Sequence, residues 1–142
     1  MVERLVELRR HLEHLRRLRP NVTGPDVLRE DLSLHNDVFH SLLTICQLVI
    51  DIAGELSANA GRRFESYTEA VRNLRHDGRF SNEIVATLAQ LPGMRNVLVH
   101  EYLTVNMDLV IAALDNLGPV EEFMDILARD VTPPATPDPE TR

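Results

Sequence analysis

Apolar residues recur at three- and four-residue spacing along most of the chain, and this spacing predicts helices. The first such segment, residues 2–19, carries a regular series of leucines: Leu5, Leu8, Leu12, Leu15 and Leu18. They form one apolar stripe, with Arg and Glu on the opposite face. Pro20 ends this predicted helix, because proline lacks the backbone N–H that a continuing helix needs.

The second predicted helix begins at Asp26 or at Ser33 and continues to Ala58. Between Leu42 and Leu56 its apolar residues occupy most of the circumference, so it needs partners on more than one side, which also favours a homodimer. Its polar side chains recur every three or four positions and form one line that faces water or a cleft. That line consists of Asp37, Ser41, Thr44, Gln47, Asp51 and Glu55.

Two shorter helices follow, each marked by a capping serine. Residues 66–69, Ser-Tyr-Thr-Glu, match a capping box and predict a helix that reaches about His76. Ser81 is a second candidate N-cap, ahead of a helix that continues to a break at Pro92-Gly93.

The last predicted helix begins after Asn106, a good N-cap, and bends at residues 118–119, Gly-Pro. Residues 131–142 hold four prolines and almost no apolar residues, which predicts a disordered tail. No segment alternates with the period of two that a strand requires. The sequence therefore predicts one all-α domain over residues 1–130, an antiparallel bundle of about five helices.

Length and composition narrow the class of protein. A chain of 142 residues with 44% apolar content can bury one core, and no apolar run is long enough to cross a bilayer. The charged N-terminal residues do not resemble a signal peptide, so we expect a cytoplasmic protein that contacts no membrane. Cys46 is the only cysteine, which excludes an internal disulfide and argues against a Cys-based metal site. We expect it to be a small core residue.

The net charge of −7 argues against broad, charge-driven binding of nucleic acid, so any RNA contact must be local. All 15 basic residues are arginines, and two groups of them could supply such a contact or could simply be solvated helix faces. One group is Arg4, Arg9, Arg10, Arg16, Arg17 and Arg19, and the other is Arg62, Arg63, Arg72, Arg75 and Arg79.

The segment RNVLVHEY carries the candidate chemistry, since Gly-rich phosphate loops, His-Glu-x-x-His helices and nucleophile elbows are absent from the sequence. At about 100° per residue, Arg95 and Tyr102 share nearly one helix face, whereas His100 lies roughly 140° from Arg95. Arg95 and His100 can converge if the long Arg side chain reaches across, if the break at residues 92–93 leaves Arg95 in an irregular turn, or if a symmetric partner completes the site.

An Arg and a His suit cleavage of RNA without a metal ion, because the ribose 2′-hydroxyl is itself the nucleophile. His can move protons near neutral pH, and the Arg fork can neutralise charge on the phosphoryl oxygens. The structural alternative is that Arg95 pairs with Asp51 or Glu55, while His100 and Tyr102 cap a packed interface.

Residues 93–106, GMRNVLVHEYLTVN, resemble the signature of the HepT-like family, which lies within the HEPN group of helical ribonucleases. The family pattern is Arg-x4-His-x-Tyr. The positions that match the family here are Arg95, Asn96, His100, Glu101 and Tyr102. The segments LVIDIAGEL and SYTEAVRNL also follow in family-like order, so the resemblance covers about residues 1–130.

This resemblance implies a HEPN-like bundle that forms a homodimer, with a composite cleft where the two motifs meet. It implies a metal-independent endoribonuclease toxin that cleaves cellular RNA, with Arg95 and His100 catalytic and no cofactor. Tyr102 would be modified with AMP by a minimal nucleotidyltransferase (MNT) antitoxin, and the adduct would block the cleft. Supporting positions would be Asn96, Asp51 and Glu101, of which Asp51 would orient Arg95 or His100.

Two other functions remain open. The chain could be a non-catalytic helical module that docks on a nucleotidyltransferase and helps to bind nucleotide, with Arg95 on a phosphate. It could also be a structural bundle whose motif is only an interface. Loss of RNA cleavage in a His100 variant would distinguish the ribonuclease from both.

Overall fold

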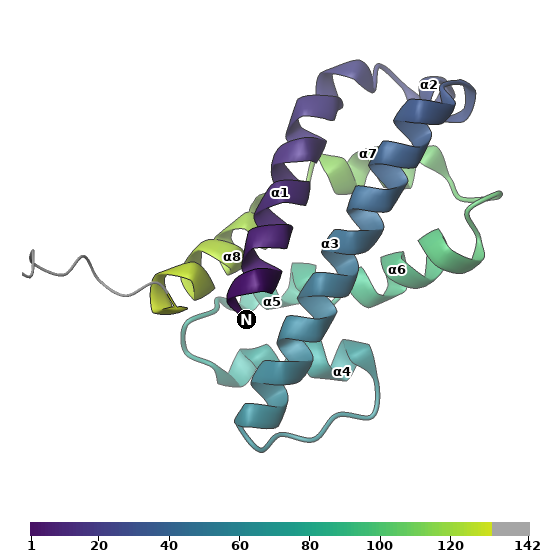
Figure 1. The fold of residues 1–142 in the computed structure, drawn as a ribbon. Helices are drawn as coiled ribbons and strands as arrows, with labels where there is room; N and C mark the ends of the chain where they lie inside the picture. Colours follow the sequence, from purple (N-terminus) through teal and green to yellow (C-terminus); the bar gives the residue numbers. More distant parts are fainter. Residues whose placement is uncertain (132–142) are drawn as a thin grey trace, which may run out of the picture.

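The computed structural model describes residues 1–131, which form eight α-helices and two 3₁₀ turns without a β-strand (Figure 1). The α-helices are α1 (Val2–Leu18), α2 (Pro25–Glu30), α3 (Leu32–Asn59), α4 (Tyr67–Arg72), α5 (Asn82–Leu88), α6 (Leu91–His100), α7 (Met107–Leu114) and α8 (Gly118–Val131). The 3₁₀ turns are η1 (Arg19–Asn21) and η2 (Asn73–His76). The predicted all-α class is confirmed. Of the predicted tail, Val131 belongs to α8 and the remainder lies outside the described residues.

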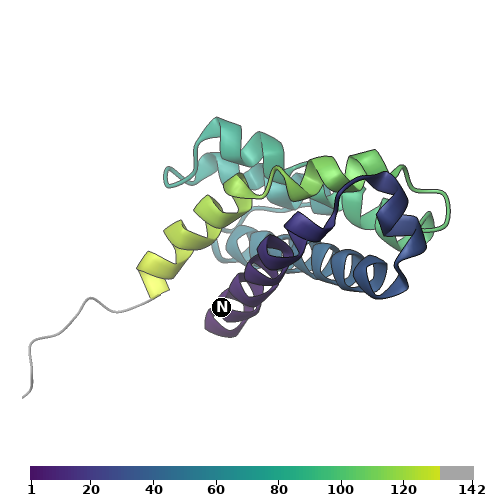
Figure 2. The ribbon, with the colours of Figure 1, turned by 90° about the horizontal axis from the view of Figure 1, so that it is seen from above.

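Helix α3 is the centre of the fold and contacts α1, α2, α4 and α6. α1 runs antiparallel to it, and in Figure 2 these two helices form one layer with α4 to α7 on the other side. α3 therefore finds the several partners that its apolar circumference requires within its own chain. By length and composition alone α3 could also cross a membrane, but half of its most apolar window is buried in the fold, as in a core helix.

The predicted leucine stripe of α1 lies in the core. Its first four leucines are buried against α3 and α8, and Leu18 is partly buried beside them. Each fully buried leucine stabilises the fold by roughly 1.5–3 kcal/mol. Cys46 on α3 is fully buried as predicted, and burial raises the pKa of its thiol to about 12, so it remains protonated and unreactive near neutral pH.

The polar line predicted along α3 does not face one environment. Ser41 is buried, and its Oγ lies 2.9 Å from Nδ1 of His11 on α1. Glu55 accepts a 3.0 Å hydrogen bond from Arg4, also on α1. Asp51 is exposed, between these ends of the line. The line therefore serves helix packing as well as solvent contact.

The predicted start of the second helix, at Asp26 or Ser33, is wrong because two helices meet there. Residues 25–30 form α2 with Pro25 in its first turn, where the missing N–H of proline costs nothing. Asp31 then adopts an extended backbone, and its carboxylate accepts a 3.0 Å hydrogen bond from the Leu34 N–H. Asp31 thereby ends one helix and caps the next.

Two predicted interruptions also differ from the structure, which raises the number of α-helices above the five expected. The chain breaks after Leu88, and Pro92 lies inside the first turn of α6, a position that tolerates proline. Residues 118–119 begin a new helix, α8, because α7 already ends at Leu114.

The three predicted N-caps are confirmed. Ser66, Ser81 and Asn106 each accept a hydrogen bond from a backbone N–H in the first turn of the following helix. At Ser66 the capping box is shifted by one residue, since Glu69 accepts from the N–H of Glu65 at 3.1 Å. A side-chain cap therefore marks the start of four of the eight α-helices: α3, α4, α5 and α7.

The cap at Asp31 predicts the stability of two variants. Asp31→Ala should lower the free energy of unfolding by about 1 kcal/mol, because the Leu34 N–H loses its acceptor. Asp31→Asn keeps an acceptor oxygen and should stay within a few tenths of a kcal/mol of the wild type. Urea unfolding followed by circular dichroism measures both, and equal losses in the two variants would show that the cap contributes little.

Candidate active site

The motif residues lie on α6 and on the turn that follows it. α6 packs against α3 through Leu98, which is buried, while Arg95 is partly buried and His100 is exposed at the last helical position. Because α6 is helical from residue 91 onward, the predicted irregular turn at Arg95 is wrong. On a regular helix Arg95 and His100 lie roughly 140° apart, and within residues 1–131 Arg95 is hydrogen-bonded to Gln47 and Asn96 and not to His100.

Arg95 is held by side chains on both helices. Its Nε donates to Gln47 Oε1 on α3 at 3.2 Å, and its Nη1 donates to Asn96 Oδ1 at 3.2 Å. Within residues 1–131 its Nη2 donates to no acceptor. The guanidinium is therefore fixed along one edge and keeps donors available for an anionic group.

Asp51 contacts Arg95 only through a relay. Gln47 Nε2 donates to Asp51 Oδ1 at 2.9 Å, so Asp51 orients the amide whose oxygen holds Arg95. Direct pairing of Arg95 with Asp51 or Glu55, the structural alternative, is not what the structure shows, since Glu55 pairs with Arg4. Gln47 was not predicted as a site residue, although its place next to Asp51 in the polar line was the available signal.

His100 and Glu101 are exposed at the end of α6, and neither side chain is hydrogen-bonded within residues 1–131. The backbone of Glu101 closes the helix by donating to the Val97 carbonyl at 2.9 Å, and its own carbonyl accepts from Thr104. The backbone of Glu101 thus ends α6. The imidazole of His100 is free to meet a substrate or a second protein chain.

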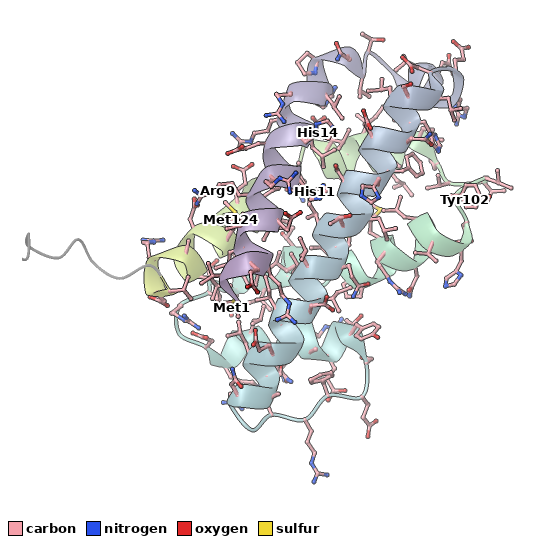
Figure 3. The ribbon with its side chains drawn as sticks, viewed as in Figure 1. Met1, Arg9, His11, His14, Tyr102 and Met124 are labelled. Carbon is pink, nitrogen blue, oxygen red and sulfur yellow. The ribbon has the colours of Figure 1, made fainter. Side chains whose placement is uncertain are left out.

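Tyr102 projects from the connection between α6 and α7 at the edge of the fold (Figure 3). The prediction that Tyr102 shares a helix face with Arg95 is therefore wrong, because α6 ends at His100. Its side chain is about half exposed and borders a pocket of about 340 Å³ against α3. The other lining residues are His35, Asn36, Phe39, His40, Leu43 and Leu98. The rings of His35 and Phe39 stack in this pocket with centroids 4.0 Å apart. The phenol is therefore accessible from solvent, next to an aromatic surface.

Comparison with known proteins settles the family. A family model described as ribonuclease HepT-like matches residues 8–127. The chain belongs to the HepT-like ribonuclease family. The mRNA nuclease HepT of Shewanella oneidensis is 25% identical to this HepT-like chain over 101 residues, 70% of this chain and 76% of the relative. A protein of Archaeoglobus fulgidus, provisionally named an RNase, is 32% identical over 80 residues, 56% of this chain and 61% of that protein.

Solved structures confirm that the HepT-like chain has the HEPN fold. A tri-AMPylated HEPN toxin of Shewanella oneidensis, in complex with MNT antitoxin, matches with a TM-score of 0.78 at 20% identity, over 90% of this chain and 96% of that one. A chain of a toxin–antitoxin complex with AMP-PNP matches with a TM-score of 0.76 at 20% identity, over 89% and 95% of the two chains. At these identities the likeness shows the fold.

The relay predicts that Gln47 is a positioning residue. Gln47→Ala should slow single-turnover RNA cleavage about tenfold to hundredfold, because a guanidinium without its anchor is misplaced by the order of 1 Å. The Nε–H signal of Arg95 in ¹⁵N NMR spectra should broaden in the same variant. Asp51→Asn is the matched control, since Asn still accepts from Gln47 Nε2. If Gln47→Ala cleaved RNA at the wild-type rate and its Arg95 signal were unchanged, Gln47 would have no positioning role.

Proposed function

We propose that this HepT-like chain is the toxin of a toxin–antitoxin pair and acts in the cytoplasm as a metal-independent endoribonuclease on cellular RNA. The observation that carries the proposal is Arg95, whose guanidinium is anchored by Gln47 and Asn96 and still has free donors. Such a preorganised cation stabilises charge that develops on a phosphoryl group. The family membership and the nuclease names of the relatives support the same reaction class.

The proposed reaction is an internal transesterification. The ribose 2′-oxygen attacks the adjacent phosphorus and loses its proton to a base, while the bond from phosphorus to the 5′-oxygen breaks and that oxygen takes up a proton. The products are a 2′,3′-cyclic phosphate and a 5′-hydroxyl. His100 moves a proton in this scheme, as imidazole can near neutral pH, and Arg95 neutralises the non-bridging oxygens.

The proposed active unit is a homodimer. In one chain Arg95 and His100 diverge around α6, whereas a second copy related by a two-fold axis could place its His100 beside the Arg95 of the first. Apolar side chains next to the motif are exposed in the single chain: Val99, Leu103 and Leu109. Their burial in a symmetric contact would stabilise such a dimer.

The proposed control is addition of AMP to the Tyr102 hydroxyl by an MNT antitoxin. The phenol is half exposed, so an enzyme can reach it. An AMP group would add bulk and negative charge next to Arg95 and His100, and both would exclude the RNA phosphate. The HEPN toxin that shares this fold is itself tri-AMPylated and in complex with MNT antitoxin, which supports the proposal.

The first test is cleavage of total bacterial RNA by purified protein in excess EDTA. Wild type should cleave, whereas Arg95→Ala and His100→Ala should each be at least about a hundredfold slower, because each removes a group that acts on the transition state. His14→Ala on α1 is the matched histidine control and should cleave as wild type does. Equal cleavage by His100→Ala would overturn the assigned role of His100.

The same assay tests the composite site. After subunit exchange, a mixture of Arg95→Ala and His100→Ala should recover about a quarter of wild-type activity, because half of the dimers are mixed and each mixed dimer holds one intact site. A mixture as inactive as its components would contradict sites shared between chains. If no protein cleaves RNA but wild type binds ATP in calorimetry, the non-catalytic nucleotide-binding module is favoured instead.

The modification test uses the two tyrosines of the chain as a matched pair. With an MNT antitoxin and ATP, the intact mass of wild type should increase by one or more AMP units, and RNA cleavage should fall. Tyr67→Phe should gain the same mass, because Tyr67 lies on α4 outside the motif. Tyr102→Phe should gain none, and an adduct on this variant would place the modification elsewhere.

A further inference from the structure

The two groups of arginines differ in how many of their members pair with carboxylates. In the N-terminal segment, four of them contact carboxylates: Arg4 with Glu55, Arg10 with Glu7, Arg16 with Glu121 and Arg19 with Asp115. Arg79 contacts Asp77 and Asp130, and its hydrogen bond lowers the pKa of the Asp77 carboxyl. Within residues 1–131, the exposed side chains without any ion pair in the second group are Arg62, Arg63, Arg72 and Arg75.

These four unpaired arginines lie where α3 ends and α4 and η2 follow, at the lower end of the molecule in Figure 1. His76 is next to them: desolvation and then the charges of Arg62 and Arg75 lower the pKa of its imidazole. The loop that carries Arg62 and Arg63 is also fixed in place, since Asn73 Nδ2 donates to the Arg63 carbonyl at 3.1 Å. The positive charge is therefore concentrated on an ordered part of the surface.

A cavity of about 410 Å³ adjoins this loop. Residues 64–68 line one side of it, and Pro92 and Asn96 of α6 line the other. Two of its aromatic side chains are partly open to solvent, with exposed fractions of 36% for Phe64 and 51% for Tyr67. The cavity thus connects the charged loop to Asn96, whose Oδ1 accepts the hydrogen bond from Arg95.

We infer that the loop of Arg62 and Arg63 together with this cavity, here called the basic groove, binds single-stranded RNA and leads it to Arg95. In the groove the guanidinium groups contact phosphates, and the rings of Phe64 and Tyr67 stack against unpaired bases. The inference rests on the proposed ribonuclease function and adds its substrate-binding residues. Because the chain carries a net charge of −7, a polyanion is attracted only where unpaired positive charge is concentrated. Residues 62–75 hold four unpaired arginines, against two, Arg9 and Arg17, on α1.

The two carboxylates of this segment, Glu65 and Glu69, are outnumbered by the four unpaired arginines of residues 62–75. Glu69 is directed toward the chain, since its Oε2 accepts from the N–H of Glu65 at 3.1 Å. Glu65 is exposed and forms no ion pair within residues 1–131. Exposed rings next to guanidinium groups favour unpaired bases over duplex RNA, whose bases are stacked inside the helix and cannot reach them.

The test is fluorescence anisotropy with a labelled, single-stranded 2′-O-methyl RNA of about 12 nucleotides, which fills one binding track and cannot be cleaved. The protein is full-length, and intact mass shows it to be free of AMP. Arg62→Gln/Arg63→Gln should raise Kd about tenfold or more and reduce the slope of log K against log salt by about 1.4, that is about 0.7 for each phosphate that an arginine no longer neutralises. Tyr67→Ala should raise Kd roughly fivefold to a hundredfold.

The matched control is Arg9→Gln/Arg17→Gln, which removes the same charge from exposed, unpaired arginines of α1. The Kd of this variant for the RNA should stay within about twofold of the wild-type Kd at moderate salt, where distant charges are screened. Thermal unfolding checks that each variant folds, and Tyr67→Leu, which keeps the apolar bulk but not the ring, replaces Tyr67→Ala if that variant unfolds.

Three results would overturn the basic groove: equal weakening by the two double variants, no effect of Tyr67→Ala, or tighter binding of a duplex of the same length. The groove would also be contradicted if Arg62→Gln/Arg63→Gln lost binding to an acidic antitoxin surface but still bound RNA. Cleavage of unmodified RNA separates the two proposals. If RNA binding depends on the groove arginines but no RNA is cleaved, the groove is supported and the ribonuclease function is contradicted. If RNA is cleaved but the groove variants bind it as wild type does, only the groove is contradicted.

Discussion

Burial of α3 on several sides is the constraint on which the rest of the structure depends. Its apolar circumference is covered by α1, α2, α4 and α6, so several of its polar residues meet a specific neighbour on another helix. Ser41 meets His11, Glu55 meets Arg4, and Gln47 meets Arg95. The helix that supplies the largest share of the core also supplies the anchor of the candidate catalytic arginine, since Gln47 reaches Arg95 where α3 packs against α6.

The pairing of charges also differs from one part of the surface to another. Carboxylates neutralise most arginines of the N-terminal segment, and Arg79 is bound between Asp77 and Asp130. The arginines after α3 keep their charge, next to two partly exposed aromatic rings and the helix that carries Arg95. An acidic protein can in this way present a local surface for a polyanion, with the candidate catalytic residues on α6 and the proposed substrate contacts on the loop beside it.

Much of the fold could be predicted because its signals are local. Caps at Ser66, Ser81 and Asn106 and the apolar stripe of α1 depend on residues within four positions of one another, and all are confirmed. The extra helices were missed where two signals compete. Asp26 and Ser33 are both acceptable caps, yet Asp31 between them makes the hydrogen bond, and Pro92 marks the first turn of a helix rather than its break.

The amino-acid sequence by itself determined the all-α class, the HepT-like motif and the helical placement of Arg95 and His100, whereas Tyr102 lies beyond the end of that helix. Only the tertiary structure decided that Gln47 holds Arg95, a contact between residues 48 positions apart, and which arginines are neutralised by carboxylates. The reason is physical: helical periodicity and capping act within a few residues, whereas ion pairs and side-chain hydrogen bonds between helices depend on how those helices pack.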